Sequence, residues 1–130
     1  MIIDSSAVVA ILGLESDARE FVDAMEKAAD RRLSVVSYVE AAVVLDSRRI
    51  PALSRRLDEF VREAQVRLEP VTVEQAQLAR EAYRDFGKGR HRAGLNFGDC
   101  FAYALAKEKG EPLLFKGDDF RKTDVEAAEY

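Results

Sequence analysis

The chain has 130 residues, of which 48% are hydrophobic and 34% charged, and its formal net charge is −4. This length and composition can bury one core without disulfides, so a single domain spanning residues 1–130 is predicted. The negative charge excludes a protein that grips nucleic acid through bulk positive charge alone, and the single Cys100 excludes a disulfide scaffold or a zinc knuckle.

The first half of the chain alternates short apolar runs with helical patterns. Met1–Ile3 is an apolar run that predicts a strand, and Ser5–Leu12 predicts a buried helix closed by Gly13. Ser16 is the expected cap of a second helix. The remaining elements expected here are that helix to about Ala29, a strand at Leu33–Val36, and helices at Ser37–Arg48 and Pro51–Ala64.

The second half repeats this alternation. Val66–Val71 predicts a strand, and Thr72 caps a helix that reaches about Phe86. A glycine-rich loop at Gly87–Gly94 separates it from a helix that begins near Asn96 and ends near Gly110, before a last strand at Pro112–Phe115. Short apolar strands alternating with helices predict an α/β fold with helices on both faces of a parallel sheet, although the pattern leaves the strand order open.

Acidic residues follow the predicted strands. Asp4 ends the first strand, Glu40 lies early in the helix after the second, Asp99 opens the helix after the glycine-rich loop, and Asp118 and Asp119 follow the fourth strand. Ligands bind an open parallel sheet at the carboxyl ends of its strands, so the fold is expected to bring these acids together.

Each acid also has an ordinary structural explanation. Asp4 and Asp99 could simply cap helices, and the pair at 118–119 could form an exposed turn. Glu40 differs, because its helical neighbours three and four residues away form an apolar or small face and include no lysine or arginine: Val36, Ser37, Val43 and Val44. A carboxylate buried there needs a partner.

A cluster of carboxylates is best neutralised by a hard divalent cation, which predicts Mg²⁺ or Mn²⁺. Zinc is disfavoured because His91 and Cys100 are the only soft ligands, and a buried, inert thiol is the expected state of Cys100. Carboxylate-bound Mg²⁺ typically activates water against a phosphate. Lys88, Arg90 and Arg92 stand in the loop before Asp99, where they are expected to contact nucleic-acid phosphates.

Asp4 in "MIIDSSA", Glu40 in "SYVEAAVVL", Asp99 in "NFGDCFAYALA" and the acids of "LLFKGDDF" together resemble the PIN-domain family, and more narrowly its VapC-type toxins of bacterial toxin-antitoxin pairs. The resemblance covers residues 1–125. It implies a three-layer α/β/α fold with a short-stranded central parallel sheet and cleavage of RNA with Mg²⁺ or Mn²⁺. It also implies a homodimer that a VapB-like antitoxin restrains. The single cysteine fits a reducing cytosol and the chain shows no signal for export or membrane insertion, so a cytoplasmic protein without membrane contact is expected.

The resemblance also implies roles for individual residues. Asp4, Glu40 and Asp99 match the three central acids, with Asp4 and Asp99 as direct metal ligands and Glu40 acting through a water. Similar sequences often carry Thr or Ser, any residue, then Asp or Asn after the last strand, whereas this chain has Phe-Lys-Gly at 115–117. Asp118 or Asp119 must then serve as the fourth acid, and Asp119 is favoured because Asp-Phe is common at this point.

Two other functions fit the same residues. An acidic Mg²⁺ pocket could accept a phosphoryl group, although one class of such proteins requires a second Asp two residues after Asp4, where Ser6 stands. Alternatively, a nuclease-like fold could bind RNA or a partner protein without catalysis. Replacing Asp99 with Asn distinguishes these readings, because a pure binding module would keep its effect.

Overall fold

The computed structural model describes residues 1–130 and contains a four-stranded sheet whose strands are all parallel. The strands are β1 (Ile2–Ile3), β2 (Arg31–Ser34), β3 (Val66–Glu69) and β4 (Leu113–Leu114), in the spatial order β3-β2-β1-β4. The predicted parallel sheet with short strands is therefore confirmed, and its strand order is now known.

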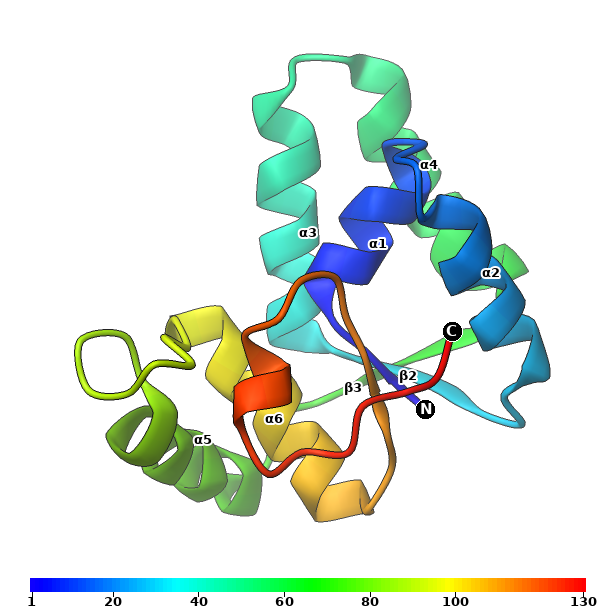
Figure 1. Ribbon diagram of the computed structural model, residues 1–130. Coiled ribbons are helices and arrows are strands. Elements are labelled where there is room, and N and C mark those ends of the chain that lie inside the picture. Colours follow the sequence, from blue (N-terminus) through cyan, green and yellow to red (C-terminus); the bar gives the residue numbers. More distant parts are fainter.

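Helices cover both faces of this sheet (Figure 1). Helices α1 (Ser5–Leu12), α2 (Ala18–Lys27), α3 (Val35–Ser47) and α4 (Pro51–Glu63) lie on one face. Helices α5 (Val73–Phe86) and α6 (Phe97–Lys109) pack together on the other, near the short 3₁₀ helix η1 (Phe120–Lys122). The expected three-layer α/β/α architecture is present. No helix has the length and apolar character needed to span a membrane.

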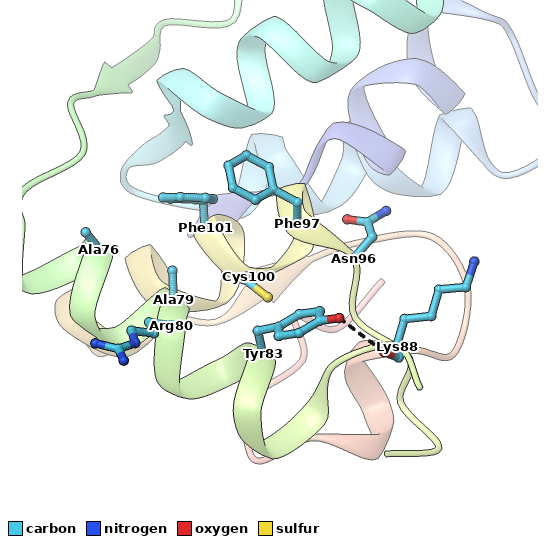
Figure 2. A pocket seen from close by; sticks show the side chains of 9 residues that line it. All are labelled: Ala76, Ala79, Arg80, Tyr83, Lys88, Asn96, Phe97, Cys100 and Phe101. Carbon is cyan, nitrogen blue, oxygen red and sulfur yellow. Dashed lines mark hydrogen bonds between the residues drawn. The ribbon is translucent and has the colours of Figure 1, made fainter. Parts of the chain in front are cut away.

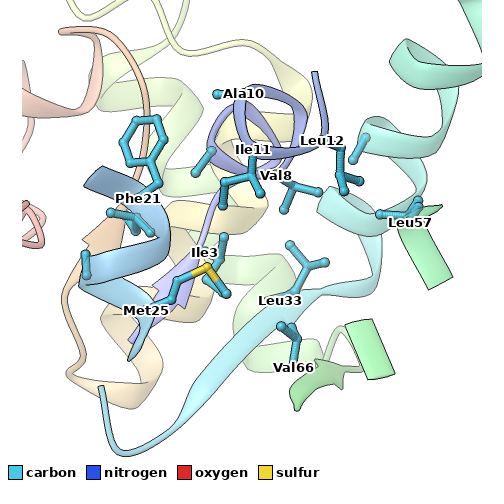
Figure 3. Close-up of a cluster of buried hydrophobic side chains, with 14 of the residues drawn as sticks. Ile3, Val8, Ala10, Ile11, Leu12, Phe21, Met25, Leu33, Leu57 and Val66 are labelled. Atoms are coloured by element: carbon cyan, nitrogen blue, oxygen red, sulfur yellow. The ribbon is translucent and has the colours of Figure 1, made fainter. Parts of the chain in front are cut away.

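Two hydrophobic clusters explain why strands of two residues suffice. Successive side chains of a strand point to opposite faces. Ile3 and Leu114 therefore enter the cluster beneath α1–α4 (Figure 3), whereas Ile2 and Leu113 enter the cluster beneath α5 and α6. All four side chains are fully buried, so β1 and the edge strand β4 each contribute to both halves of the core.

The order of the strands creates a crevice at one end of the sheet. The chain passes from β1 to β2 to β3 through α1–α4, and then returns across the opposite face through α5 and α6 to place β4 beside β1. Connections therefore leave β1 and reach β4 on opposite faces, which opens a space outside the carboxyl ends of these neighbouring strands. Asp4 follows β1 at this point, and Asp119 lies in the segment after β4.

The second strand begins earlier than its apolar pattern predicts. Arg31 and Arg32 belong to β2, and Ser34 caps α3 by accepting a hydrogen bond from the backbone N–H of Val36 at 3.2 Å. Arg32 can enter the sheet because its guanidinium donates to Glu69 at 2.7 Å and to Glu111 at 3.0 Å. Ion pairs of Arg32 with Glu69 and Glu111 thus stabilise this part of β2 in place of the apolar side chains that the prediction required.

One local expectation was wrong, and the surroundings of Glu40 differ from their residue pattern. Ser16 does not cap α2, because that helix begins only at Ala18 and has no side-chain cap bond. The face of α3 near Glu40 is less buried than its residue types indicate, since Val43 is 62% and Val44 is 38% exposed. Glu40 itself is partly buried, as expected, and the side of α3 that packs against its neighbours consists of Ser37, Ala41 and Leu45.

Candidate active site

Asp4 stands at the junction of β1 and α1 and is only 2% exposed. One carboxylate oxygen, Oδ2, caps α1 by accepting hydrogen bonds from the Ser6 backbone N–H at 3.0 Å and from Ser6 Oγ at 2.6 Å. The other, Oδ1, is buried without any hydrogen-bond partner. Burial, with a smaller contribution from the nearby Glu40 and opposed by these hydrogen bonds, raises the pKa of Asp4 to about 6.

Ser6 also joins Asp4 to the segment after β4. Its hydroxyl oxygen accepts a hydrogen bond from the backbone N–H of Lys116 at 3.0 Å. The Lys116 ammonium group pairs in turn with Glu15 at 2.7 Å and with Asp17 at 3.1 Å. The two loops at this end of the sheet are therefore held together around the Asp4 carboxylate.

Glu40 reaches the same place from α3. Ser5 Oγ donates to Glu40 Oε1 at 2.5 Å, and the other oxygen of that carboxylate lies against Gly98 of α6. A Cβ atom on Gly98 would stand 2.0 Å from Glu40 Oε2, so only glycine lets the carboxylate occupy this position. Glu40 is thus held between Ser5 and Gly98.

Asp99 is the third residue of α6 rather than its cap. Asn96 is the cap, and the two residues exchange hydrogen bonds: the Asp99 N–H donates to Asn96 Oδ1 at 2.8 Å, and the Asn96 N–H donates to Asp99 Oδ2 at 3.0 Å. This reciprocal arrangement fixes the direction of the Asp99 carboxylate. Burial is the main cause that raises the pKa of Asp99 to about 7, with added repulsion from Asp4, Glu40 and Asp119.

The fourth expected acid, Asp119, is exposed and precedes η1. Its charge contributes to the raised pKa of Asp99, which places it within electrostatic reach of the cluster. Asp118 is also exposed, and its charge is not one of the main causes of the raised pKa of Asp99. The fold therefore brings together four of the five candidate acids: Asp4, Glu40, Asp99 and Asp119.

The donor set at this site fits a hard divalent cation. No group of three or more acidic, histidine or cysteine side chains is already arranged closely enough to hold a metal ion. However, a buried carboxylate oxygen without a partner is costly, and Asp4 Oδ1 is such an atom. A cation bound there would pair that oxygen and offset the repulsion that Asp4, Glu40 and Asp119 add to the effect of burial on the pKa of Asp99. All available donors are oxygens, which Mg²⁺ and Mn²⁺ prefer.

The three basic residues of the glycine-rich loop, Lys88, Arg90 and Arg92, differ in their surroundings. Lys88 lines a pocket that also contains Asn96, and the Arg90 guanidinium lies 5.8 Å from the centre of the Tyr83 ring. Arg92 is exposed and makes no ion pair or hydrogen bond. His91 Nδ1 accepts a hydrogen bond from the Ala93 N–H at 3.0 Å, so this histidine has a structural role in the loop.

The thiol of Cys100 is buried, as expected. Burial and the neighbouring Asp99 raise the pKa of Cys100 to about 11, which keeps it protonated and inert. Sequence reasoning missed Gly98 and the capping oxygen of Asn96. The "NFGD" motif contained a signal for Asn96, because Asn followed three residues later by an acid is typical of a reciprocal helix cap, whereas Gly98 matters through its contact with the distant Glu40.

Comparison with known proteins identifies the family. The family model of the PIN domain matches residues 1–126 of this chain. Ribonuclease VapC28 of Mycobacterium tuberculosis is 57% identical over 129 residues, which cover 98% of this chain and 97% of that protein.

Solved structures agree on the fold. VapC20 of M. tuberculosis, described as a toxin that cleaves the sarcin-ricin loop, superimposes with a TM-score of 0.75 at 18% identity and covers 98% of both chains. A toxin-antitoxin complex from Klebsiella pneumoniae has a TM-score of 0.72 at 11% identity and covers 95% of this chain and 92% of that one.

Proposed function

Because the chain belongs to the PIN-domain family, and within it to the VapC ribonucleases, we propose that it is the toxin of a toxin-antitoxin pair and hydrolyses RNA with Mg²⁺. Mn²⁺ is expected to substitute for Mg²⁺. The single observation that supports the metal-dependent chemistry is the buried Asp4 Oδ1, which lies unpaired among other carboxylates. Ribonucleases of this family are generally dependent on a divalent metal.

We assign catalytic roles to Asp4, Glu40, Asp99 and Asp119, with Asp4 and Asp99 as the direct ligands of the cation. When bound, the cation would polarise a phosphate oxygen and lower the pKa of a water. Ser6 keeps one oxygen of Asp4 engaged, so the other remains directed at the cation site. The Asn96 cap holds Asp99 in the same way.

Glu40 is the residue best placed to orient and accept a proton from the attacking water. Its carboxylate is held by the hydrogen bond from Ser5 Oγ and by contact with Gly98, so no metal is needed to position it. A positioned carboxylate of this kind typically contributes about 10²- to 10⁴-fold to a hydrolytic rate. Lys88, Arg90 and Arg92 are proposed to contact flanking phosphates of the substrate.

The antitoxin partner is proposed to bind at a groove formed by α1, α2 and α4. Its volume is about 670 Å³, and its apolar lining includes Leu14, Val22 and Phe60. Two arginines and several glutamates stand among these residues, so a VapB-like segment with apolar anchors and flanking charges of both signs would suit it. The toxin-antitoxin complex from K. pneumoniae, which has this fold, supports such a partner. We also propose that the toxin is a homodimer, which sedimentation at several concentrations would test.

The activity is tested by incubating the purified protein with single-stranded RNA, and with DNA of the same sequence, in Mg²⁺ or in excess chelator. Cleavage of the RNA alone, and only with the cation, is expected. Asp4→Asn and Asp99→Asn should abolish it. Asp119→Asn should reduce it, whereas Asp118→Asn is the matched control and should leave it intact. Cleavage that persists in Asp99→Asn, or in chelator, would refute the proposed mechanism.

A further inference from the structure

Helices α5 and α6 and the loop residues Lys88 and Asn96 border a separate open pocket of about 570 Å³ (Figure 2). Tyr83 lines it from α5, and Phe97 and Phe101 line it from α6. The ring centres of Phe97 and Phe101 are 5.0 Å apart. Asn96 and Phe97 stand immediately before Gly98 and Asp99 in the chain. The pocket and the acidic site therefore share the first turn of α6, on different sides of a helix about 10 Å wide.

The aromatic side chains of this pocket are unusually open to water. Phe97 is 75% exposed although it directly precedes the residues that hold the acidic site, and Tyr83 is 43% exposed. Exposed apolar surface of this kind marks a place where something binds. A flat, rigid ring on a helix is also the side chain on which unpaired bases stack.

The pocket is lined by positive charge and therefore suits a polyanion, whereas the whole chain has a net negative charge. Its lining contains Arg80 and Lys88 and no carboxylate. A neighbouring, more polar hollow of similar size shares Arg80 and Tyr83 with it and adds two arginines, Arg84 and Arg90, with one glutamate. Aromatic rings next to guanidinium and ammonium groups form the combination that binds single-stranded nucleic acid.

The polar groups of the pocket also favour one base. Asn96 uses its oxygen to cap α6, which leaves its NH₂ group as a donor, and Lys88 carries a second donor. Guanine presents two adjacent acceptors, O6 and N7, whereas adenine presents a donor beside N7. Donor groups on the protein therefore match guanine and repel the amino group of adenine.

We propose that this pocket binds one unpaired base of the RNA substrate by stacking, guanine in preference to adenine, and so selects where the proposed ribonuclease cuts. The proposal rests on the proposed function for its substrate class. Its central residue is Phe97, with Tyr83 on the opposite wall and Asn96 and Lys88 as hydrogen-bond donors.

The test measures binding in excess chelator, so that no cleavage occurs. The probes are three fluorescein-labelled oligouridines that carry a central guanosine, adenosine or abasic site, and a fourth that carries 2-aminopurine. Because the chain lacks tryptophan, quenching of 2-aminopurine reports stacking without a protein background. The variants are Phe97→Ala, Phe97→Leu and Phe97→Tyr, and Val73→Ala on α5 is the matched control, since Val73 is 76% exposed and lies outside the pocket.

The wild-type protein is expected to bind the guanosine probe most tightly and to quench 2-aminopurine. Phe97→Ala should lower affinity for the guanosine probe about 10- to 100-fold, the range for loss of one stacked base, and leave the abasic probe unchanged. Phe97→Tyr should restore binding, whereas Phe97→Leu should not. Val73→Ala should behave as wild type.

Equal affinity of the wild type for all probes, no measurable binding, or an equal loss for the abasic probe would overturn the proposal. A dimer that Phe97→Ala dissociates and Phe97→Leu preserves would instead assign this face to a second copy of the chain. The two proposals fail separately. Base preference without Mg²⁺-dependent cleavage would refute only the ribonuclease, and cleavage without base preference would refute only the pocket.

Discussion

Replacing Asp99 with Asn should stabilise the metal-free protein at about pH 8. The fold raises the pKa of Asp99 from 3.8 to about 7, mainly by burial. If the whole shift reflected folding, the charged carboxylate would destabilise the native state by about 4 kcal/mol. The side chain is partly exposed, so solvent screening reduces this to about 2 kcal/mol. Asparagine removes the charge but keeps an oxygen that can accept the Asn96 N–H bond.

The sign of the pH dependence follows from proton binding. Between about pH 4 and about pH 7 the unfolded chain has released the Asp99 proton while the native protein still holds it. The native state therefore binds more protons, and its stability falls as pH rises through this window. The gain from Asp99→Asn should be about 2 kcal/mol at pH 8 and about half that at pH 5.

Urea unfolding of both proteins in excess chelator, at these two pH values, measures the difference directly. A gain that grows with pH would support a carboxylate strained by burial and by its acidic neighbours. A loss of about 1 kcal/mol at both pH values, the usual cost of a lost helix cap, would refute the reasoning. Asp119 is largely exposed, so Asp119→Asn serves as a control with a much smaller expected gain.

Three further outcomes are expected. Gly98→Ala places a methyl group against Glu40, whose flexible side chain can swing away from it. RNA cleavage should therefore fall about 10- to 100-fold while the urea midpoint stays nearly constant. Equal losses of stability and activity would contradict this. Mg²⁺ or Mn²⁺ should raise the melting temperature of the wild type by binding the native state, and Asp4→Asn should remove this increase in a thermal scan; an equal increase in both proteins would argue against this site. Arg32→Leu should cost about 3 kcal/mol in urea unfolding, because Glu69 and Glu111 lose their shared partner in a largely buried site; a neutral result would show that solvent compensates these acids.

The local order of elements was predictable because it depends on short-range patterns. Apolar runs ended by caps and glycines located all four strands and the main helices, and the "NFGD" motif announced the start of α6. Errors occurred where a distant contact decided the boundary. Arg32 joins β2 only because Glu69 and Glu111 come from other parts of the chain.

The sequence by itself determined the fold class, the resemblance to PIN domains and the acids that could form a site, since residue types and spacing carry that information. Only the tertiary structure decided which acids meet. Strand order places the ends of β1 and β4 side by side, and Gly98 lets Glu40 approach from α3. Burial of Asp4 Oδ1 without a partner, and the open aromatic pocket beside Asp99, likewise depend on the packing of α6 against α3 and α5. These are contacts between segments far apart in the chain, and no local pattern encodes them.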